Sequence, residues 1–525
     1  MDTETVPLAL LPDGRPMSGL ADLVTARAAA SPGAVAVSGE GPDLTYSQLD
    51  ERVSKVASGL VAAGVGPEDR VVYLGPNSGR LLEVLHGAAR AAAIPVPVNH
   101  RLSANEVRSV LRDAEPSFVV ADRRSSHLVG AMAEWGEGCP VLVADPARRA
   151  SYEDWRDSQT GGDPGLRVAA GDTQLILYTS GTTGLPKGIE LTGANLAHAL
   201  RAMQTTLVVD TESVAMAPIP FFHIAGLGMA LLTCLDGGRL LLGDATSAED
   251  LLHRLVSSHV SHAAAVPAVL QQLLSLPAAE TADWSALRMI VYGAAPMNPK
   301  LLARTQHVLG CGLMQGYGLT ESTGGVFVLS PDDHRAAGER PELLATVGRA
   351  LPGVEARVVD PATGRDVPTG QPGEVWVAGP WVMKGYWRRP ELTAETVVDG
   401  RWLRTGDGGV LDPNGYLNLR DRTKDMIVSG GENVYPGEVE KVLLSYPGVT
   451  EAAVVGIPSE RWGESPFAFV VYSDPDLRPA AVISWTRTQL AHYKCPVGIR
   501  LVAEMPRNAA GKILKTQLRL MHSMD

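Results

Sequence analysis

The sequence predicts an α/β fold with a large N-terminal domain and a smaller α+β domain at the C-terminus. In roughly the first hundred residues, helix-like and strand-like segments alternate, which is typical of helices layered on a largely parallel sheet. From about Val347, short β-like runs are separated by Gly and Pro turns, and they predict a small β-rich subdomain. After Asp425, helix and strand patterns alternate again, so we expect an α+β module that could fold on its own.

The early elements follow from the spacing of apolar residues. Apolar residues at helical spacing, with a stop at Gly64, predict a helix at 45–63. The uninterrupted apolar run at 70–74 predicts a buried strand. The same criteria predict helices at 20–30 and 81–93, and strands at 34–38 and 94–98.

The later elements continue this alternation and then change in texture. In the middle of the chain we expect strands at 174–178 and 289–292 and helices at 196–203 and 251–257. The β-like runs of the subdomain lie at 354–360, 373–379 and 416–421. The C-terminal module contains a helix at 437–446, strands at 451–457 and 467–473, and a helix at 480–493.

Composition excludes several classes of protein. With 45% hydrophobic and 20% charged residues among 525, the chain has the balance of an ordinary globular enzyme of several domains. A net charge of −12 without a dense Lys/Arg block argues against nucleic-acid binding. The four cysteines lie far apart, so neither a zinc site nor a disulfide framework is indicated. The N-terminus lacks a signal-peptide pattern and no apolar run approaches ~18–20 residues, so we expect a cytoplasmic protein without a membrane span.

The segment Thr179–Gly188 is the most specific motif in the chain. It follows a strand pattern and holds four hydroxyl side chains, three glycines and Lys187 within TSGTTGLPKG. Hydroxyls and exposed amides donate to anionic oxygens, glycine lets the backbone come close, and lysine adds positive charge. It is not a Walker A loop, because Pro186 stands where the second Gly is needed. We therefore expect a phosphate-binding loop between a strand and a helix; the alternative is a Ser/Thr/Gly-rich surface turn.

The run YTSGTTGLPKG resembles the signature of the adenylate-forming superfamily, which includes acyl- and aryl-CoA synthetases, non-ribosomal peptide adenylation domains and beetle luciferases. Further blocks recur in the family's order over nearly the whole chain, and the resemblance is nearest to AMP-forming fatty acyl- and aryl-CoA ligases. It implies a domain at 1–423 that binds ATP and the acid, followed by a mobile domain at 424–525. It also implies that ATP is bound by Thr179, Ser180, Gly181, Thr182, Thr183, Gly184 and Lys187.

Two further blocks resemble those that hold adenine and the metal. In the turn at 292–296, the resemblance implies adenine contacts from Gly293, Ala294, Ala295 and Pro296. In the block QGYGLTES at 315–322, Gly316 and Gly318 flank Tyr317, whose ring could lie on the adenine. Thr320 would donate to the α-phosphate, and Glu321 would bind Mg²⁺ beside the phosphates. The alternatives are a plain strand-end turn and a helix start.

The ribose and hinge positions come next. Asp407 in WLRTGD matches the aspartate that accepts from the ribose hydroxyls, and Arg422 matches a second ribose contact. The family usually has an apolar residue after this aspartate, whereas here two glycines follow, which could loosen the loop. Lys424 falls at the hinge between the two domains.

The last blocks concern catalysis and the acceptor. Lys512, in PRNAAGK, matches the lysine that stabilises charge during adenylation, and Lys515 is the expected bystander. The loop of Ser429, Gly430 and Gly431 would line the acceptor tunnel after the small domain rotates, with Lys494 near its entrance.

The acid would bind next to the block PFFHIAG. The resemblance places His223 at the mouth of the pocket, near the carboxylate; the alternative is a packing histidine. The pocket lining would be Ile219, His223, Ile224, Ala225, Gly293, Ala294, Gly316 and Gly318. Relatives that activate amino acids have an aspartate in this block, and its absence disfavours an α-amino acid. A fatty acid and an aromatic acid remain open.

The resemblance implies an enzyme that uses ATP and Mg²⁺ to form an acyl-adenylate and then transfers the acyl group to a thiol, with coenzyme A as the expected acceptor. The alternatives are transfer to a carrier-protein phosphopantetheine, an amine or another nucleophile, a luciferase-like oxygenase, and a non-catalytic ATP-binding relative. No nucleic-acid partner is expected, and a homodimer is left open.

Overall fold

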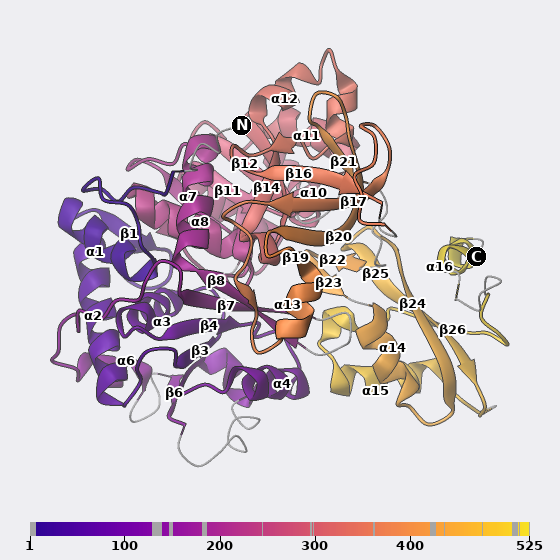
Figure 1. The fold of residues 1–525 in the computed structure, drawn as a ribbon, viewed down its shortest axis with the longest axis horizontal. Helices are drawn as coiled ribbons and strands as arrows, with labels where there is room; N and C mark the ends of the chain where they lie inside the picture. Colours follow the sequence, from indigo (N-terminus) through magenta and orange to yellow (C-terminus); the bar gives the residue numbers. More distant parts are fainter. Residues whose placement is uncertain are drawn as a thin grey trace.

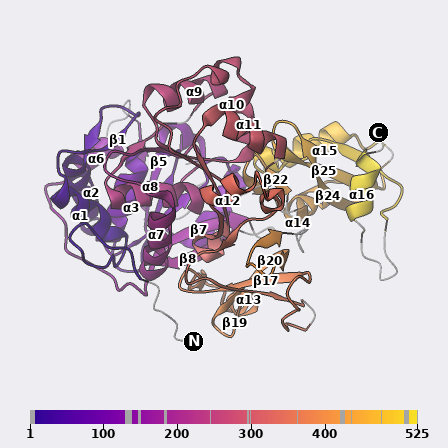
Figure 2. The same ribbon diagram turned by 90° about the horizontal axis from the view of Figure 1, so that it is seen from above.

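The computed structural model describes residues 7–128, 139–145, 151–180, 186–243, 245–293, 297, 299–360, 363–419, 427–434, 436–474, 476–506, 513 and 515–523. Within them the chain forms a large N-terminal domain, a β-rich subdomain beside it and a C-terminal domain (Figure 1). Viewed from above, the β-rich sheet and the C-terminal domain both project from the large domain (Figure 2).

The first sheet of the large domain is fully parallel, as expected from the strand–helix alternation. Its order is β4 (Ile94–Val98), β3 (Arg70–Leu74), β5 (Phe118–Asp122) and β6 (Val141–Ala144). Its connecting helices are α3 (Gly79–Arg90), α4 (Ala104–Ala114), the 3-10 turn η1 (Arg123–Leu128) and α6 (Tyr152–Asp157). These strands are buried on both faces, which explains their uninterrupted apolar runs.

The second sheet has nine strands and is mixed. Its order is β15 (Arg349–Ala350), β14 (Gly324–Leu329), β13 (Gly312–Leu319), β12 (Met289–Gly293), β11 (His262–Ala265), β9 (Val214–Met216), β10 (Arg239–Leu241), β1 (Val35–Ser38) and β2 (Leu44–Thr45). The associated helices are α1 (Leu20–Ala30), α2 (Tyr46–Ala62), α7 (Gly193–Leu207), α8 (Ile224–Asp236), α9 (Ala248–Ser257), α10 (Pro267–Ser275), α11 (Pro299–Leu309), α12 (Pro331–Ala336), η2 (Pro277–Glu280), η3 (Thr320–Ser322) and η4 (Pro341–Ala345). The central strands run parallel, and the edge strands β2, β14 and β15 run antiparallel.

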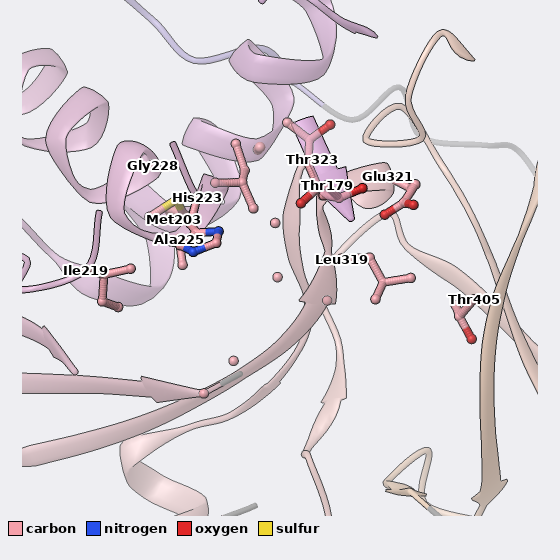
Figure 3. A pocket seen from close by; sticks show the side chains of 18 of the residues that line it. Thr179, Met203, Ile219, His223, Ala225, Gly228, Leu319, Glu321, Thr323 and Thr405 are labelled. Carbon is pink, nitrogen blue, oxygen red and sulfur yellow. The ribbon is translucent and has the colours of Figure 1, made fainter. Parts of the chain in front are cut away.

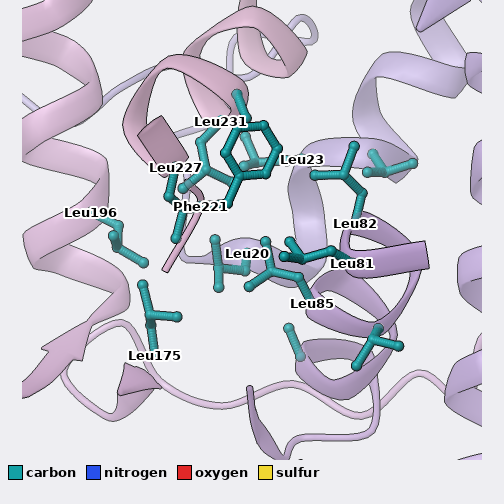
Figure 4. Close-up of a cluster of buried hydrophobic side chains, with 14 of the residues drawn as sticks. Leu20, Leu23, Leu81, Leu82, Leu85, Leu175, Leu196, Phe221, Leu227 and Leu231 are labelled. Carbon is teal, nitrogen blue, oxygen red and sulfur yellow. The ribbon is translucent and has the colours of Figure 1, made fainter. Parts of the chain in front are cut away.

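The largest apolar core lies between these two sheets. Leucines of α1, α3, α7 and α8 meet there, together with Leu175 and Phe221 (Figure 4). Phe221 is 1% exposed and lies just before the start of α8. Burial of these side chains fixes the positions of α7 and α8, whose other faces border the candidate site.

The loop predicted between a strand and a helix is followed by a strand and not by a helix. Strand β7 (Thr173–Ser180) pairs antiparallel with β8 (Pro186–Thr192), and β8 also pairs with β18 (Gly385–Tyr386). The helix α7 begins only after β8. The sequence prediction was wrong on this point because β8 carries a lysine, a proline and a glycine at its start, which favour a turn in isolation.

The β-rich subdomain is built as predicted, with one correction. Its sheet is β16 (Glu355–Val359), β17 (Gly373–Ala378), β20 (Trp402–Leu411) and β19 (Val397–Val398), with β21 (Leu417–Leu419) on β20 and α13 (Pro390–Thr396) beside it. The two glycines after Asp407 do not loosen a loop, because they lie inside β20. A Cβ on Gly409 would meet Val375 at 2.7 Å and Leu417 at 2.8 Å, so close packing requires the glycine.

The C-terminal domain has its own sheet and core. Its strands are β23 (Glu432–Val434), β22 (Ile427–Ser429), β25 (Gly463–Tyr472), β24 (Val449–Ser459) and β26 (Ile499–Leu501), and its helices are α14 (Pro436–Leu444), α15 (Pro479–Gln489), η5 (His492–Lys494) and α16 (Lys515–Ser523). The helices and strands predicted here are confirmed. The chain changes sheet between β21 and β22, and Lys424 lies in that interval, outside the described residues.

Candidate active site

A cavity of about 440 Å³ opens where α7 and α8, the β7–β8 hairpin, the nine-stranded sheet, the β-rich sheet and the C-terminal domain meet. One end is lined by α7 and α8, and the other by the ends of β7 and β8 together with η3 and β20. In Figure 3, Met203 and His223 lie on one side of the cavity, whereas Thr179, Glu321 and Thr405 lie on the other. The cavity therefore has an apolar end and a polar end.

The polar end brings together residues from three separate motifs. Thr179 and Lys187 reach it from the β7–β8 hairpin, Thr320 and Glu321 from η3, and Asp407 from β20. The sequence predicted a role for each of them, and the fold places them on one wall although up to 228 residues separate them in the chain. Hydroxyl, ammonium and carboxylate groups gathered in this way can hold a polyphosphate and a hard cation.

Tyr386 ties two of these charged groups together, and sequence reasoning missed it. Its hydroxyl donates to Glu321 Oε1 at 2.8 Å and accepts from Lys187 Nζ at 3.3 Å. The Lys187 ammonium also lies 4.4 Å from the centre of the Tyr386 ring. Tyr386 is 4% exposed, and the pairing of β18 with β8 sets its position. No local pattern in the sequence signals this contact, because it depends on pairing between strands far apart in the chain.

We expect Tyr386→Phe to slow adenylation roughly tenfold, since it removes a hydrogen bond to a charged group while keeping the ring. The loss should shrink as Mg²⁺ is raised, because Glu321 keeps its charge and loses only its orientation. The measurement is the initial rate of acid-dependent pyrophosphate exchange across a Mg²⁺ titration. A rate equal to that of the wild type at low Mg²⁺ would show that the hydroxyl positions nothing.

Asp407 is held by a tyrosine from the neighbouring sheet. The Tyr317 hydroxyl donates to Asp407 Oδ2 at 2.7 Å, and the backbone amide of Asp407 donates to the Thr405 hydroxyl at 3.1 Å. The carboxylate is therefore held in one orientation at the polar end of the cavity. The Tyr317 ring is packed near Phe327 and does not line the cavity in this arrangement. Its contact with adenine stays a prediction.

Most residues predicted to line an acyl pocket line this cavity. The predicted lining residues brought to the cavity are Ile219, His223, Ile224, Ala225, Gly293, Gly316 and Gly318. Helices α7 and α8 add a wall that the sequence did not assign, made of Leu196, Ala199, Leu200, Met203, Thr206, Leu207, Gly228, Met229 and Leu231. None of these described wall residues is charged, so this end suits an apolar tail.

The glycines of the pocket are there for two different reasons. A Cβ on Gly318 would meet the Gly324 carbonyl oxygen at 1.9 Å, and one on Gly293 would meet that of Gly316 at 2.4 Å. Close backbone contact therefore requires glycine at both positions. A Cβ on Gly316 would meet nothing within 4 Å, and Gly316 lines the cavity. Glycine at 316 thus leaves room for a ligand.

His223 connects the cavity to the C-terminal domain. Its Nε2 lies 2.9 Å from Glu432 Oε2, and Arg101 donates to the other carboxylate oxygen of Glu432 at 3.0 Å. Burial tends to raise the pKa of Glu432, but His223 and Arg101 together hold it below its ordinary value. Gly431 lines the cavity next to Val266 of the large domain. The sequence named this loop for the acceptor tunnel but did not single out Glu432.

Other predicted residues lie away from the cavity. Ser429 and Gly430 do not line it, and Gly430 lies against the ring of Trp462 instead. The ammonium of Lys494 is buried between two carboxylates. The side chain of Ser180 and the residues Gly181, Thr182, Thr183, Gly184, Ala294, Ala295, Pro296, Arg422, Lys424 and Lys512 lie outside the described part of the chain.

This arrangement agrees with comparisons against known proteins. Residues 24–387 match the model of the AMP-binding enzyme family, and residues 438–512 match that of its C-terminal domain. The chain belongs to the AMP-binding enzyme family. The predicted superfamily and the predicted enzyme class, an AMP-forming acid–thiol ligase dependent on ATP, are thereby confirmed.

The relatives match nearly the whole length of this chain. A feruloyl-CoA synthase from Amycolatopsis sp is 39% identical over 508 residues, covering 95% of this chain and 98% of the relative. The amide bond synthetase McbA from Marinactinospora thermotolerans has a TM-score of 0.86 at 31% identity, covering 96% and 99%.

A third relative is solved in two complexes. The o-succinylbenzoate CoA synthetase MenE from Bacillus subtilis, as a double mutant bound with its product analogue OSB-NCoA, has a TM-score of 0.83 at 29% identity, covering 95% and 98%. In complex with the acyl-adenylate OSB-AMP, the TM-score is 0.68 at 28% identity, covering 95% and 97%.

The described residues contain no group of three or more His, Cys, Asp or Glu side chains placed to hold a metal ion. No helix in the same part of the chain is both long and apolar enough to span a membrane.

Proposed function

We propose that this enzyme activates an apolar, preferably aromatic, carboxylic acid as its acyl-adenylate and passes the acyl group to coenzyme A. One observation carries the proposal. A single cavity joins an uncharged end between α7 and α8 to a polar end that holds Lys187, Thr320, Glu321 and Asp407. An acid bound with its tail between the helices would present its carboxylate to the phosphate-binding groups.

The residues fit a magnesium ion. Mg²⁺ is usually held by one or two carboxylates together with substrate phosphates and water. Glu321 offers one carboxylate oriented by Tyr386, and the hydroxyls of Thr179 and Thr320 line the same end. When bound, the ion would neutralise charge on the phosphates during the displacement.

The chain's own residues then act mainly by position and charge. A carboxylate oxygen of the acid attacks the α-phosphorus of ATP, and the bond to pyrophosphate breaks. Lys187 and Thr179 would hold the phosphates, Thr320 would donate to the α-phosphate, and Asp407 would accept from the ribose hydroxyls. In the second step the acceptor sulfur attacks the acyl carbon and AMP leaves with the bonding electron pair. We expect that acceptor to enter past Gly431 and His223, which both line the cavity.

The pocket supports an acid with an uncharged tail. Since none of the described wall residues on α7 and α8 is charged, an α-amino acid would find no carboxylate on this wall to pair with its ammonium. Similarity to a feruloyl-CoA synthase supports an aromatic acid, and a fatty acid is the second candidate.

The acceptor is tested with a product assay. The enzyme would receive ATP, Mg²⁺ and a panel of phenylpropenoic, benzoic and fatty acids, with coenzyme A, a set of carrier proteins or a panel of amines. We expect coenzyme A thioesters, detected by mass spectrometry. Amides without thioesters would instead favour an amine acceptor, the alternative supported by the similarity to McbA. Oxidised, light-emitting products would favour a luciferase-like enzyme.

We expect Gly316→Leu to lower kcat/KM for a phenylpropenoic acid roughly 10- to 100-fold, because the side chain would project into the cavity that the aromatic ring needs. The kcat/KM for acetate should fall less than about threefold, since acetate needs no space there. Steady-state rates with the two acids provide the comparison. An equal loss for both acids would place Gly316 away from the acyl pocket.

A hinge at Lys424, the domain limits at 1–423 and 424–525, a cytoplasmic location, a carrier-protein partner and a homodimer stay predictions from the sequence.

A further inference from the structure

One short segment of the large domain makes a dense set of polar contacts with the C-terminal domain. It runs from the end of β4 into the first turn of α4, which faces α15 across the domain boundary (Figure 1). The hydrogen bonds are Asn99–Tyr493 (3.3 Å), Arg101–Glu432 (3.0 Å), Ser103–Gln489 (2.9 Å), Asn105–Gln489 (3.2 Å), Glu106–Ala491 (2.8 Å) and Glu106–Lys494 (2.6 Å). We call residues 99–106 the docking segment.

The most buried of these contacts is an ion cluster. Lys494 Nζ lies 2.6 Å from Glu106 Oε1 and 2.8 Å from Glu438 Oε1, and its side chain is only 3% exposed. Glu106 belongs to the large domain, whereas Lys494 and Glu438 belong to the C-terminal domain. Breaking a buried ion pair by removing one partner is costly, because the remaining charge loses its compensation. Docking therefore supplies Lys494 with its second carboxylate.

Within the C-terminal domain, Lys494 is poorly compensated. Burial raises the pKa of Glu438 to about 7 despite the nearby ammonium, and its second oxygen has no hydrogen-bond partner. Burial tends to lower the pKa of Lys494, but the phenol of Tyr493 and the carboxylates of Glu438 and Glu106 hold it above its ordinary value. These are the titratable groups that face the ammonium. Glu106 is thus the partner that comes only from the other domain.

Glu106 is held in place before docking. It is the third residue of α4, and its Oε2 accepts from the backbone amide and the hydroxyl of Ser103, the N-cap residue, at 2.8 Å each. The same oxygen accepts from the Ala491 amide across the boundary. A carboxylate already fixed by its own helix cap loses little side-chain freedom when the second domain binds.

Docking also completes the active site. The C-terminal domain brings Glu432 to His223 and Gly431 to the cavity wall. The structure is more similar to MenE with the OSB-NCoA analogue than to MenE with OSB-AMP. The higher TM-score supports a shared arrangement of the domains with the complex that holds the CoA product analogue.

We propose that Glu106 is a positioning residue for the acyl-transfer step, which it serves by locking the C-terminal domain through Lys494 in the arrangement that places Glu432 on His223. It acts on acyl transfer and not on adenylation. The inference rests on the proposed function for the identity of the two steps, whereas the docking contact itself does not.

The test variant is Glu106→Gln in the full-length enzyme. Glutamine still accepts hydrogen bonds at a helix cap, so the variant removes the charge and spares the helix. We expect acid-dependent pyrophosphate exchange within about twofold of the wild type. Transfer of the acyl group from preformed acyl-adenylate to coenzyme A should fall roughly tenfold or more. The matched control is Glu115→Gln. Glu115 directly follows the same helix, and its carboxylate pairs with Arg388 inside the large domain. The control variant should change neither step.

A double-mutant cycle and hydrogen exchange keep the lock testable by itself. Lys494→Met added to Glu106→Gln should slow transfer no further than the larger single effect. The peptide covering 489–495 should exchange faster in Glu106→Gln, while the peptide covering 104–114 should stay unchanged. Unchanged hydrogen exchange in the peptide covering 489–495, or an equal loss of rate in adenylation and in acyl transfer, would overturn the proposal. If the wild type shows no acid-dependent pyrophosphate exchange, the proposed function fails, and hydrogen exchange still decides whether Glu106 docks the domain.

Discussion

Replacing Glu321 with Gln is expected to lower the rate of acyl-adenylate formation roughly 10²- to 10³-fold. The substitution keeps the size of the side chain and a hydrogen-bond acceptor for Tyr386. It removes the negative charge that is proposed to hold Mg²⁺ against the phosphates, so charge developing on pyrophosphate would lose its compensation. The measurement is single-turnover formation of acyl-AMP at saturating acid and ATP.

The control for this experiment is Glu395→Gln, which removes another carboxylate that lines the same cavity, on α13. We expect Glu395→Gln to change the rate less than about threefold, since Glu395 is proposed to contact neither the metal nor the substrate. A large loss in Glu395→Gln together with a small loss in Glu321→Gln would move the metal site to the other side of the cavity.

Replacing Lys512 with Ala is expected to slow adenylation by a similar factor, roughly 10²-fold or more, while ATP still binds. Lys512 lies outside the described residues, so the prediction rests on the sequence match of its segment and on the family to which the C-terminal domain belongs. ATP affinity measured by calorimetry should change little, because the phosphate, metal and ribose contacts are proposed to come from Lys187, Glu321 and Asp407. The expected loss of adenylation is measured as a lower rate of pyrophosphate exchange.

Lys515→Ala is the matched control for Lys512→Ala. The Lys515 ammonium lies 2.8 Å from Glu440 within the C-terminal domain, which fits the sequence prediction that it is a bystander. Removing it should leave adenylation within about twofold of the wild type. If Lys515→Ala abolished exchange and Lys512→Ala did not, the assignment of the two lysines would be reversed.

Local patterns predicted most of the scaffold. The predicted helix at 20–30 coincides with α1, and the apolar runs at 70–74 and 94–98 coincide with β3 and β4, because a strand buried on both faces must be apolar throughout. The hairpin after Ser180 was missed because the start of β8 has the composition of a turn. The glycines after Asp407 were misinterpreted because their cause is packing against β17 and β21, which no local pattern records.

The candidate site was likewise predicted only in part from local patterns. Motifs identified Thr320, Glu321 and Asp407, since each carries its own chemistry in a short run of sequence. The residues that orient them are not in those runs. Tyr386 reaches Glu321 from 65 residues away, and Glu106 meets Lys494 across 388. Such partners become visible only once the strands pair and the domains dock, because a lone tyrosine or a capping glutamate has an ordinary explanation in sequence.

The central claim, that one cavity holds ATP and an apolar acid for adenylation, is tested most directly by exchange of labelled pyrophosphate into ATP. The wild-type enzyme would be assayed with Mg²⁺ and a panel of phenylpropenoic, benzoic and fatty acids. We expect the exchange to depend on the acid, to be fastest with an uncharged aromatic or fatty tail, and to be lost in Glu321→Gln. Exchange supported by no acid of the panel, or exchange indifferent to whether an acid is present, would contradict the claim.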